Sequence, residues 1–262
     1  MNNDCLSRIF HYLTINETYS ILFVCKQYKF AIDCDLIWKE LFSEMFCHII
    51  VHNDYKLKYK QFNNLDKFLV KFQKRTVNHI YNFHTFGLDM AQLKSLPEEI
   101  GLLTNLRTLS SYTNQLQSIP KEIGLLTNLQ KLSIEINQLQ SLPKEIGLLT
   151  KLTFLDLDNN RLKSVQLEIG LLTNLRTLYF HVNRLKYLPK EIGLLTNLRK
   201  LYLHNNRLRL LPSEIGLLTN LHNLSLCNNQ LQSIPLEIGL LVHLRILDCY
   251  NNQLPSLPSE MG

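Results

Sequence analysis

Two histidines and an aspartate recur at one spacing in the second half of this 262-residue chain. Asp158, His181 and His204 follow one another at intervals of 23 residues. A carboxylate beside imidazoles can transfer protons or hold a metal ion. Both uses require the side chains to converge on an enclosed site, so the elements that carry them decide what chemistry is possible.

The interval of 23 residues belongs to a repeat that fills the chain from residue 83 onward. The heptapeptide IGLLTNL or a close variant begins at Ile100, Ile123, Ile146, Ile169, Ile192, Ile215 and Ile238. A fixed period of roughly 20 to 29 residues with the pattern L-x-x-L-x-L-x-x-N-x-L is the signature of leucine-rich repeats. Residues 83–262 are therefore predicted to form a solenoid of eight 23-residue units, the first and last atypical, with a parallel β-sheet on its concave face.

Each unit predicts one short strand, one polar turn and one outer connection. The L-x-L alternation turns two leucines inward. The Leu-Pro step predicts an extended outer segment, a glycine such as Gly101 predicts a bend, and the Leu-Leu pair that follows is expected to re-enter the core. Where the chain leaves the strand, an asparagine amide can pair with open backbone groups, and this column comprises Asn114, Asn137, Asn160, Asn183, Asn206, Asn229 and Asn252.

The outward positions of the strands vary from unit to unit while the inward positions stay almost constant. Aromatic and titratable residues concentrate in the middle units, which predicts a hot-spot surface for a protein partner centred on Phe154, Tyr179 and Tyr202. The alternative is that these positions only face solvent and drifted after duplication. The predicted substrate-binding residues are Tyr112, Glu135, Phe154, Asp156, Asp158, Tyr179, His181, Tyr202, His204 and Tyr250.

The same placement argues against catalysis at Asp158, His181 and His204. Neighbouring strands lie ~4.8 Å apart and their outward side chains point in parallel, which predicts an open, wet strip without a pocket. The chain also has no Walker loop, no GxGxxG and no HExxH motif. We therefore expect no enzyme activity, no cofactor and no metal site.

Residues 1–82 differ in composition, since all nine glycines and all eight prolines lie after residue 86. The segment contains LSRIFHYL followed by FVCKQYKFAIDCDLIWKELF, and it resembles an F-box over about 40 residues. The matching positions are Ile9-Phe10, Leu13, Val24-Cys25-Lys26, Trp38-Lys39 and Leu41. The Leu-Pro that usually opens the family's motif is replaced by Met1-Asn2.

The resemblance implies a substrate-recruiting adaptor of a cullin ubiquitin ligase. An F-box-like helical module at residues 1–45 would dock on a Skp-family adaptor, and the concave face of the repeats would bind the target protein. The adaptor-binding residues implied in this way are Leu6, Ile9, Phe10, Leu13, Val24, Cys25, Trp38 and Leu41. The fold class expected overall is α+β.

A second interpretation is a non-enzymatic repeat scaffold that binds a signalling protein such as a small GTPase. The units resemble the Ras-binding class of short intracellular repeats, which share the pattern LPxEIGxLxNL. In that case the helical N-terminus is only a cap.

Residues 46–82 are predicted to form a helical linker with a basic amphipathic helix. Residues 55–75 contain seven Lys and Arg and one acidic residue, Asp66. Their net charge of +6 equals the net charge of the whole chain. Such a run is usually a solvated helix face. Binding to phosphates or an acidic partner is the alternative, although nucleic acid is an unlikely partner for the chain as a whole.

The expected compartment follows from what the sequence lacks. The first residues do not read as a secretory peptide, and no apolar run reaches the ~18 residues that cross a bilayer. The six cysteines form no CxxC pair, which favours reduced thiols. We expect a cytoplasmic or nuclear protein without a membrane contact, working in a eukaryotic or host cell.

Overall fold

The structure is a computed structural model that describes residues 84–255. The chain divides into two units, Met1–Tyr81 and Asn82–Gly262, and the described residues belong to the second. The predicted modules at residues 1–45 and 46–82 lie outside the described residues. So do all of the predicted adaptor-binding residues, Leu6, Ile9, Phe10, Leu13, Val24, Cys25, Trp38 and Leu41.

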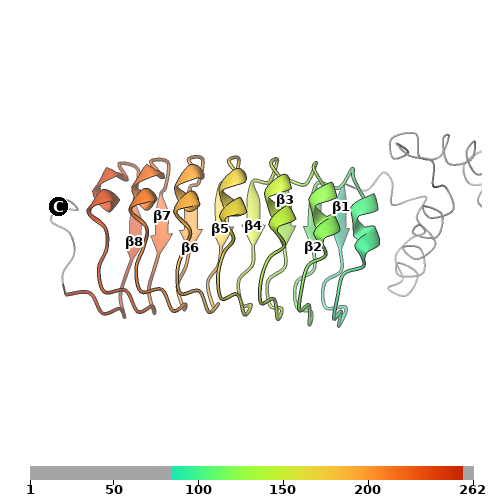
Figure 1. Cartoon of the computed structure of the whole chain (residues 1–262), viewed down its shortest axis with the longest axis horizontal. Coiled ribbons are helices and arrows are strands. Elements are labelled where there is room, and N and C mark those ends of the chain that lie inside the picture. Colours follow the sequence, from blue (N-terminus) through green and yellow to red (C-terminus); the bar gives the residue numbers. More distant parts are fainter. Residues whose placement is uncertain (1–83, 256–262) are drawn as a thin grey trace, which may run out of the picture. The chain divides into compact units, whose positions relative to one another are not determined.

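The described residues form one parallel sheet whose eight strands lie in chain order. We number the coils 1 to 8 after their strands. Figure 1 shows these strands stacked along the unit, with an outer connection between each strand and the next. They are β1 (Thr85–Gly87), β2 (Thr108–Ser110), β3 (Lys131–Ser133), β4 (Phe154–Asp156), β5 (Thr177–Tyr179), β6 (Lys200–Tyr202), β7 (Asn223–Ser225) and β8 (Ile246–Asp248).

The register of the sheet repeats the sequence period without a slip. Leu155 of β4 pairs with Leu132 on one side and Leu178 on the other. All three leucines are fully buried, because the side-chain period of a strand sends the central residue inward. Residues at the same repeat position therefore lie side by side, as the 23-residue period predicts.

The outer connections differ from the extended segments that the sequence predicts. Each enters a short 3₁₀ helix directly after the proline position, where for example Pro143 has φ −69° and ψ 146°. Proline suits this place for two reasons. Its ring fixes φ at a value that the residue before the helix can adopt, and the first helical turn needs no hydrogen bond from the proline nitrogen. The helices are η1 (Glu98–Leu102), η2 (Lys121–Leu125), η3 (Lys144–Leu148), η4 (Leu167–Leu171), η5 (Lys190–Leu194), η6 (Ser213–Leu217) and η7 (Leu236–Leu240).

The predicted role of the repeat glycines is wrong. No described glycine has a positive φ, so none supplies a bend that other residues cannot make. A Cβ on Gly147 would instead lie 2.8 Å from the carbonyl oxygen of Glu168 in the next coil. Glycine is required here because neighbouring 3₁₀ helices approach too closely for a side chain.

The Leu-Leu pair after each glycine is also split between two environments. The second leucine, such as Leu149, is fully buried, while the first, Leu148, is 53% exposed. Only the second leucine enters the core. The first belongs to a stripe on the outer surface, formed by Leu125, Leu148, Leu171, Leu194, Leu217 and Leu240.

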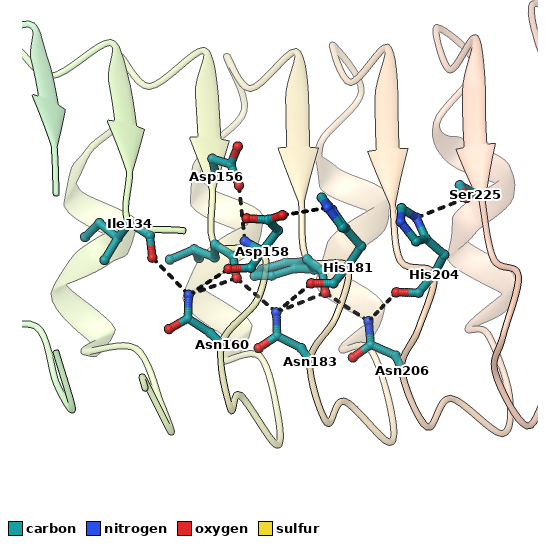
Figure 2. A network of polar contacts seen from close by, with 11 residues as sticks. Ile134, Asp156, Asp158, Asn160, His181, Asn183, His204, Asn206 and Ser225 are labelled. Atoms are coloured by element: carbon teal, nitrogen blue, oxygen red, sulfur yellow. Dashed lines mark hydrogen bonds and ion pairs between the residues drawn. The ribbon is translucent and has the colours of Figure 1, made fainter. Parts of the chain in front are cut away.

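The predicted asparagine column is confirmed and forms a ladder along the stack. The backbone N–H of Leu139 donates to Asn160 Oδ1 at 2.9 Å. Asn160 Nδ2 lies 2.9 Å from the carbonyl of Ile134 in the preceding coil and 3.2 Å from that of Leu157 in its own. The asparagine ladder, which comprises the seven predicted residues, therefore joins every pair of consecutive coils through buried or part-buried backbone groups. Figure 2 shows these bonds at Asn160, Asn183 and Asn206.

The residue before each ladder asparagine has left-handed backbone geometry, and we call this set the left-handed column. Four members are asparagines, which adopt such a conformation readily. Ile136 and Val182, with φ of 54° and 51°, are β-branched and therefore strained. From coil 2 onward the column comprises Thr113, Ile136, Asn159, Val182, Asn205, Asn228 and Asn251.

Candidate functional site

The outward residues of coils 4 to 7 form one connected group, which we call the face cluster. It comprises Phe154, Asp156, Asp158, Tyr179, His181, Tyr202, His204 and Ser225. Strand pairing brings them together, since Asp156 is registered with Tyr179, and Tyr179 with Tyr202. The predicted centre at Phe154, Tyr179 and Tyr202 is therefore contiguous in space.

Aromatic rings supply one half of the face cluster. Phe154 meets Tyr179 edge to face with 5.6 Å between ring centroids. Tyr179 stacks on Tyr202 at 4.9 Å with an interplanar angle of 23°. Such arrangements hold the rings in fixed positions and add favourable energy beyond burial. The three rings are only partly exposed, which leaves a rigid aromatic surface across coils 4 to 6.

A polar chain supplies the other half and runs along the same coils (Figure 2). Asp158 Oδ2 lies 2.6 Å from His181 Nε2. The ring of His181 stacks on that of His204 with centroids 4.4 Å apart. His204 Nδ1 in turn lies 3.2 Å from the hydroxyl of Ser225. Because the strands are parallel and in register, side chains that lie 23 residues apart in the sequence contact each other directly.

Three buried polar atoms in this region have no hydrogen-bond partner among the described residues. They are Glu135 Oε2, Asp158 Oδ1 and His181 Nδ1. Buried polar atoms are nearly always paired in native proteins, and an unpaired one marks a cost that the fold tolerates for a reason.

Burial and neighbouring charges shift the protonation of this region. Burial raises the pKa of Asp156 to about 7, and the nearby carboxyls of Asp158 and Glu135 add to the effect. Burial also raises the pKa of Glu135. Burial, then the neighbouring His181, lowers the pKa of His204. The charge of this surface therefore changes within the pH range of living cells.

The contacts do not assemble a nucleophilic relay. His204 contacts Ser225, but the carboxylate of Asp158 contacts the other histidine, and only ring stacking links the two pairs. A serine nucleophile needs its base oriented by a third group on the same imidazole. No group of three or more His, Cys, Asp or Glu within residues 84–255 is arranged to hold a metal ion.

The remaining predicted residues lie around the face cluster. Tyr112 on coil 2 and Glu135 on coil 3 are partly exposed. Tyr250 on coil 8 is 65% exposed, and hydrogen bonding to Cys227 raises the pKa of its hydroxyl. Cys227 and Ser225 thus separate Tyr250 from His204, and Tyr250 is not part of the cluster.

Ser225 is the one member of the face cluster that the sequence analysis did not select. It is 6% exposed although it points outward, because His204 and Cys227 lie against it. Serine also occupies this strand position in coils 2 and 3 as Ser110 and Ser133, so composition alone gives no signal. Only its register beside His204 could have revealed it.

The coils, the asparagine ladder and the variable sheet face define a repeat solenoid with a surface suited to protein recognition. A family model described as a leucine-rich repeat region matches residues 64–187, and one for two copies of leucine-rich repeats matches residues 173–215 and 219–259. The chain is therefore a leucine-rich-repeat protein. No F-box model is among the matches.

Solved structures agree with this assignment. A leucine-rich-repeat protein of Leptospira interrogans has a TM-score of 0.60 and 38% identity, over 70% of this chain and 52% of its own. The ectodomain of the plant membrane receptor kinase GASSHO1/SCHENGEN3 from Arabidopsis thaliana, in complex with CASPARIAN STRIP INTEGRITY FACTOR 2, has a TM-score of 0.60 and 35% identity, over 68% of this chain and 21% of its own.

The chain thus spans about half the length of the first of these proteins and about a fifth of the second. A search of curated proteins found no significant match. Within residues 84–255, no helix has the length and apolar character needed to cross a membrane.

Proposed function

We propose that this chain is a non-enzymatic protein receptor whose face cluster binds a partner protein. The observation that carries the proposal is the contrast within each coil: the buried columns are nearly constant, while the outward positions of coils 4 to 6 combine aromatic rings with partly buried charges in mutual contact. Tyrosines in rigid, partly desolvated settings are typical energetic centres of protein interfaces.

Two further facts support this proposal. Repeat solenoids use their stacked strand surface for binding, and one of the similar structures was determined with a bound factor.

The test is peptide selection against the immobilised full chain, followed by affinity measurement of the selected binders on variants. Tyr179→Ala with Tyr202→Ala removes the stacked pair and should weaken binders at least ~30-fold, because interface centres lose ~2 kcal/mol or more on truncation. The matched control is Leu167→Lys with Leu236→Lys. It changes exposed leucines to the lysine present at that repeat position in η2, η3 and η5, and binding should persist.

Selected binders that hold equally well to the tyrosine variant would disprove the proposal. Equal loss of binding in both variants would also count against it, since the loss would then not be specific to the face cluster. Circular dichroism of each variant establishes that the fold is retained.

As a second function we propose that the receptor serves a cullin ubiquitin ligase, in the cytoplasm or nucleus of a eukaryotic cell. The supporting observation is the F-box resemblance between Leu6 and Phe42, in which Ile9-Phe10, Val24-Cys25-Lys26 and Trp38-Lys39 keep their order and spacing. The alternative is a scaffold for a small GTPase, with no ligase contact.

Co-expression with a Skp-family adaptor separates these roles. We expect a complex that survives purification with the wild-type chain and with Tyr179→Ala/Tyr202→Ala. Ile9→Asp with Phe10→Asp should abolish it, because a buried apolar contact cannot accept two carboxylates. If the wild-type chain recovers no adaptor, the ligase role is excluded and the receptor role on the face cluster is untouched.

A further inference from the structure

A second surface on coils 4 to 6 departs from the repeat, on the segment that follows each ladder asparagine. This segment reads Gln-Leu-Gln-Ser at residues 115–118, 138–141 and 230–233. In the three middle coils it reads Arg-Leu-Lys-Ser at 161–164, Arg-Leu-Lys-Tyr at 184–187 and Arg-Leu-Arg-Leu at 207–210. Six neutral amides are thus replaced by six cations in three successive coils. We call this surface the basic ridge: Arg161, Lys163, Arg184, Lys186, Arg207 and Arg209.

Backbone hydrogen bonds hold the three segments in register. Arg161 N–H donates to the carbonyl of Leu139, Arg184 N–H to that of Leu162, and Arg207 N–H to that of Leu185, each at 2.9 Å. Equivalent residues therefore stack from coil to coil at about 4.8 Å, the spacing of parallel strands. The leucine between each pair of cations is fully buried, which leaves the flanking cations on the outside, and all six are exposed.

The cations of the ridge have no acidic counterpart nearby. Residues 161–167, 184–190 and 207–213 contain no Asp or Glu. No ion pair joins a ridge side chain to a carboxylate in the part of the chain that the structure describes. Like charges on adjacent strands repel each other, and the glutamines of coils 2, 3 and 7 avoid that repulsion. Within residues 84–255, no ion pair offsets this repulsion.

Two apolar side chains interrupt the same surface. Tyr187 is 58% exposed and Leu210 is 50% exposed, where coils 1 to 4 and coil 7 have serine. The surface thus combines unneutralised cations with exposed apolar groups on adjacent coils. That combination matches a chain segment in which carboxylates alternate with apolar residues.

We propose that the basic ridge, with Tyr187 and Leu210, binds an acidic segment of a partner protein. The ridge extends over three coils, about 10 Å between the outer strands, and neutral glutamines bound it on both sides. An extended peptide of a few residues covers that length, whereas a duplex or a bilayer gains from charge over a longer surface. The glutamates at the start of η4, η5 and η6 also disfavour binding to a partner with a broad anionic surface, such as a duplex or a bilayer. The proposal does not require that the face cluster binds anything.

The test uses the full chain and a fluorescein-labelled peptide of glutamates and leucines, measured by fluorescence anisotropy at low and high salt. Arg161→Gln, Arg184→Gln and Arg207→Gln together restore the repeat's own residue and should weaken binding about tenfold at low salt, with a smaller effect at high salt. The matched control is Arg176→Thr, Lys190→Ser and Arg199→Gln, which removes the same charge from other surfaces of coils 5 and 6 with residues taken from equivalent positions. The control should bind like the wild-type chain.

The basic segment at residues 55–75 also attracts acidic peptides, so the ridge is measured as the difference between two variants of equal net charge. Equal affinity of the two variants would overturn the proposal, as would no binding by the wild-type chain. Duplex DNA or phosphatidylserine vesicles that bind more tightly than the peptide, and lose binding in the ridge variant alone, would overturn it in favour of those partners. The face variant Tyr179→Ala/Tyr202→Ala should keep its affinity for the peptide.

Discussion

The asparagine ladder and the outward row at Glu135, Asp158, His181 and His204 run side by side along the same coils, two residues apart. In the ladder, each amide pairs with backbone groups of its own and the preceding coil. In the outward row, three buried polar atoms are left without a partner among the described residues. The same repeat therefore holds one polar column that is satisfied internally and one that is not.

This difference teaches which polar residues build the solenoid and which are available to a partner. Asparagine suits the ladder because one short side chain carries an acceptor and two donors for the open backbone groups around it. A residue of the outward row makes no such bond to the backbone and is free to vary between coils, and in the proposed function it contacts the partner. Five substitutions, each compared with a control or with the wild-type chain, test how the constant and the variable positions contribute to the fold.

Asn160→Ala should have the largest effect. Removing the amide leaves the Leu139 N–H and the Ile134 carbonyl unpaired and buried, at about 1–3 kcal/mol for each group, so the free energy of unfolding should fall by about 3 kcal/mol in urea titrations. Asn174→Ala is the control. It removes an exposed bond to the Thr150 carbonyl and should cost much less. Equal losses would show that the ladder is not special.

Gly147→Ala should come next, because the added methyl meets the backbone of Glu168 at 2.8 Å. Overpacking of this kind costs about 2 kcal/mol, read from the same titrations. Gly87→Ala is the matched substitution in β1, where the nearest atom is 3.4 Å away and contact is ordinary. A destabilised Gly87→Ala with an unaffected Gly147→Ala would refute the close-approach role.

The left-handed column lies between the ladder and the outward row. Substitutions in this column test whether the fold accepts backbone strain beside the face cluster. Asn205→Val should cost about 1 kcal/mol, since a β-branched residue resists φ of 55°. Val182→Asn should raise the free energy of unfolding by a smaller amount, because relief of strain is partly offset by lost apolar burial. Thermal unfolding of both variants gives the signs, and a stabilised Asn205→Val would contradict the account.

Asp156→Asn should stabilise the fold, in contrast to the losses above, and its effect should depend on pH. A raised carboxyl pKa means that the folded state binds the proton more tightly than the unfolded state. The contribution of Asp156 to stability is therefore greatest below pH ~4 and is lost as pH rises toward the folded pKa of about 7. The variant should melt at a higher temperature than the wild-type chain at pH 8, with little difference at pH 4. A larger gain at pH 4 would reverse the sign and exclude burial as the cause.

The sequence alone predicted the parts of the fold that the period dictates. The coil boundaries, the inward leucines and the pairing role of Asn160 all follow from identical residues at identical intervals. The local geometry of the outer connection did not follow, because Pro143 is compatible with both an extended segment and the start of a 3₁₀ turn. The close approach at Gly147 depends on the distance between coils, which no single unit encodes.

The candidate site was predicted by position but not by contact. Alternation placed Phe154, Tyr179 and Tyr202 on one surface. It could not show that His181 bonds to Asp158 while His204 bonds to Ser225, since side-chain rotamers decide between these partners. The F-box resemblance lies wholly outside the described residues and stays a prediction.

The hydrogen bond from a backbone N–H to a ladder amide recurs at 2.9–3.0 Å between consecutive coils. The contact between one coil and the next is therefore nearly the same along the solenoid. Recombination between near-identical stretches of the gene can insert or delete a whole 23-residue unit, and the coils on either side of the change then make a contact that the fold already uses. The length of such a protein can therefore change in whole steps during evolution while each intermediate still folds, and new surface chemistry can arise in a freshly copied coil.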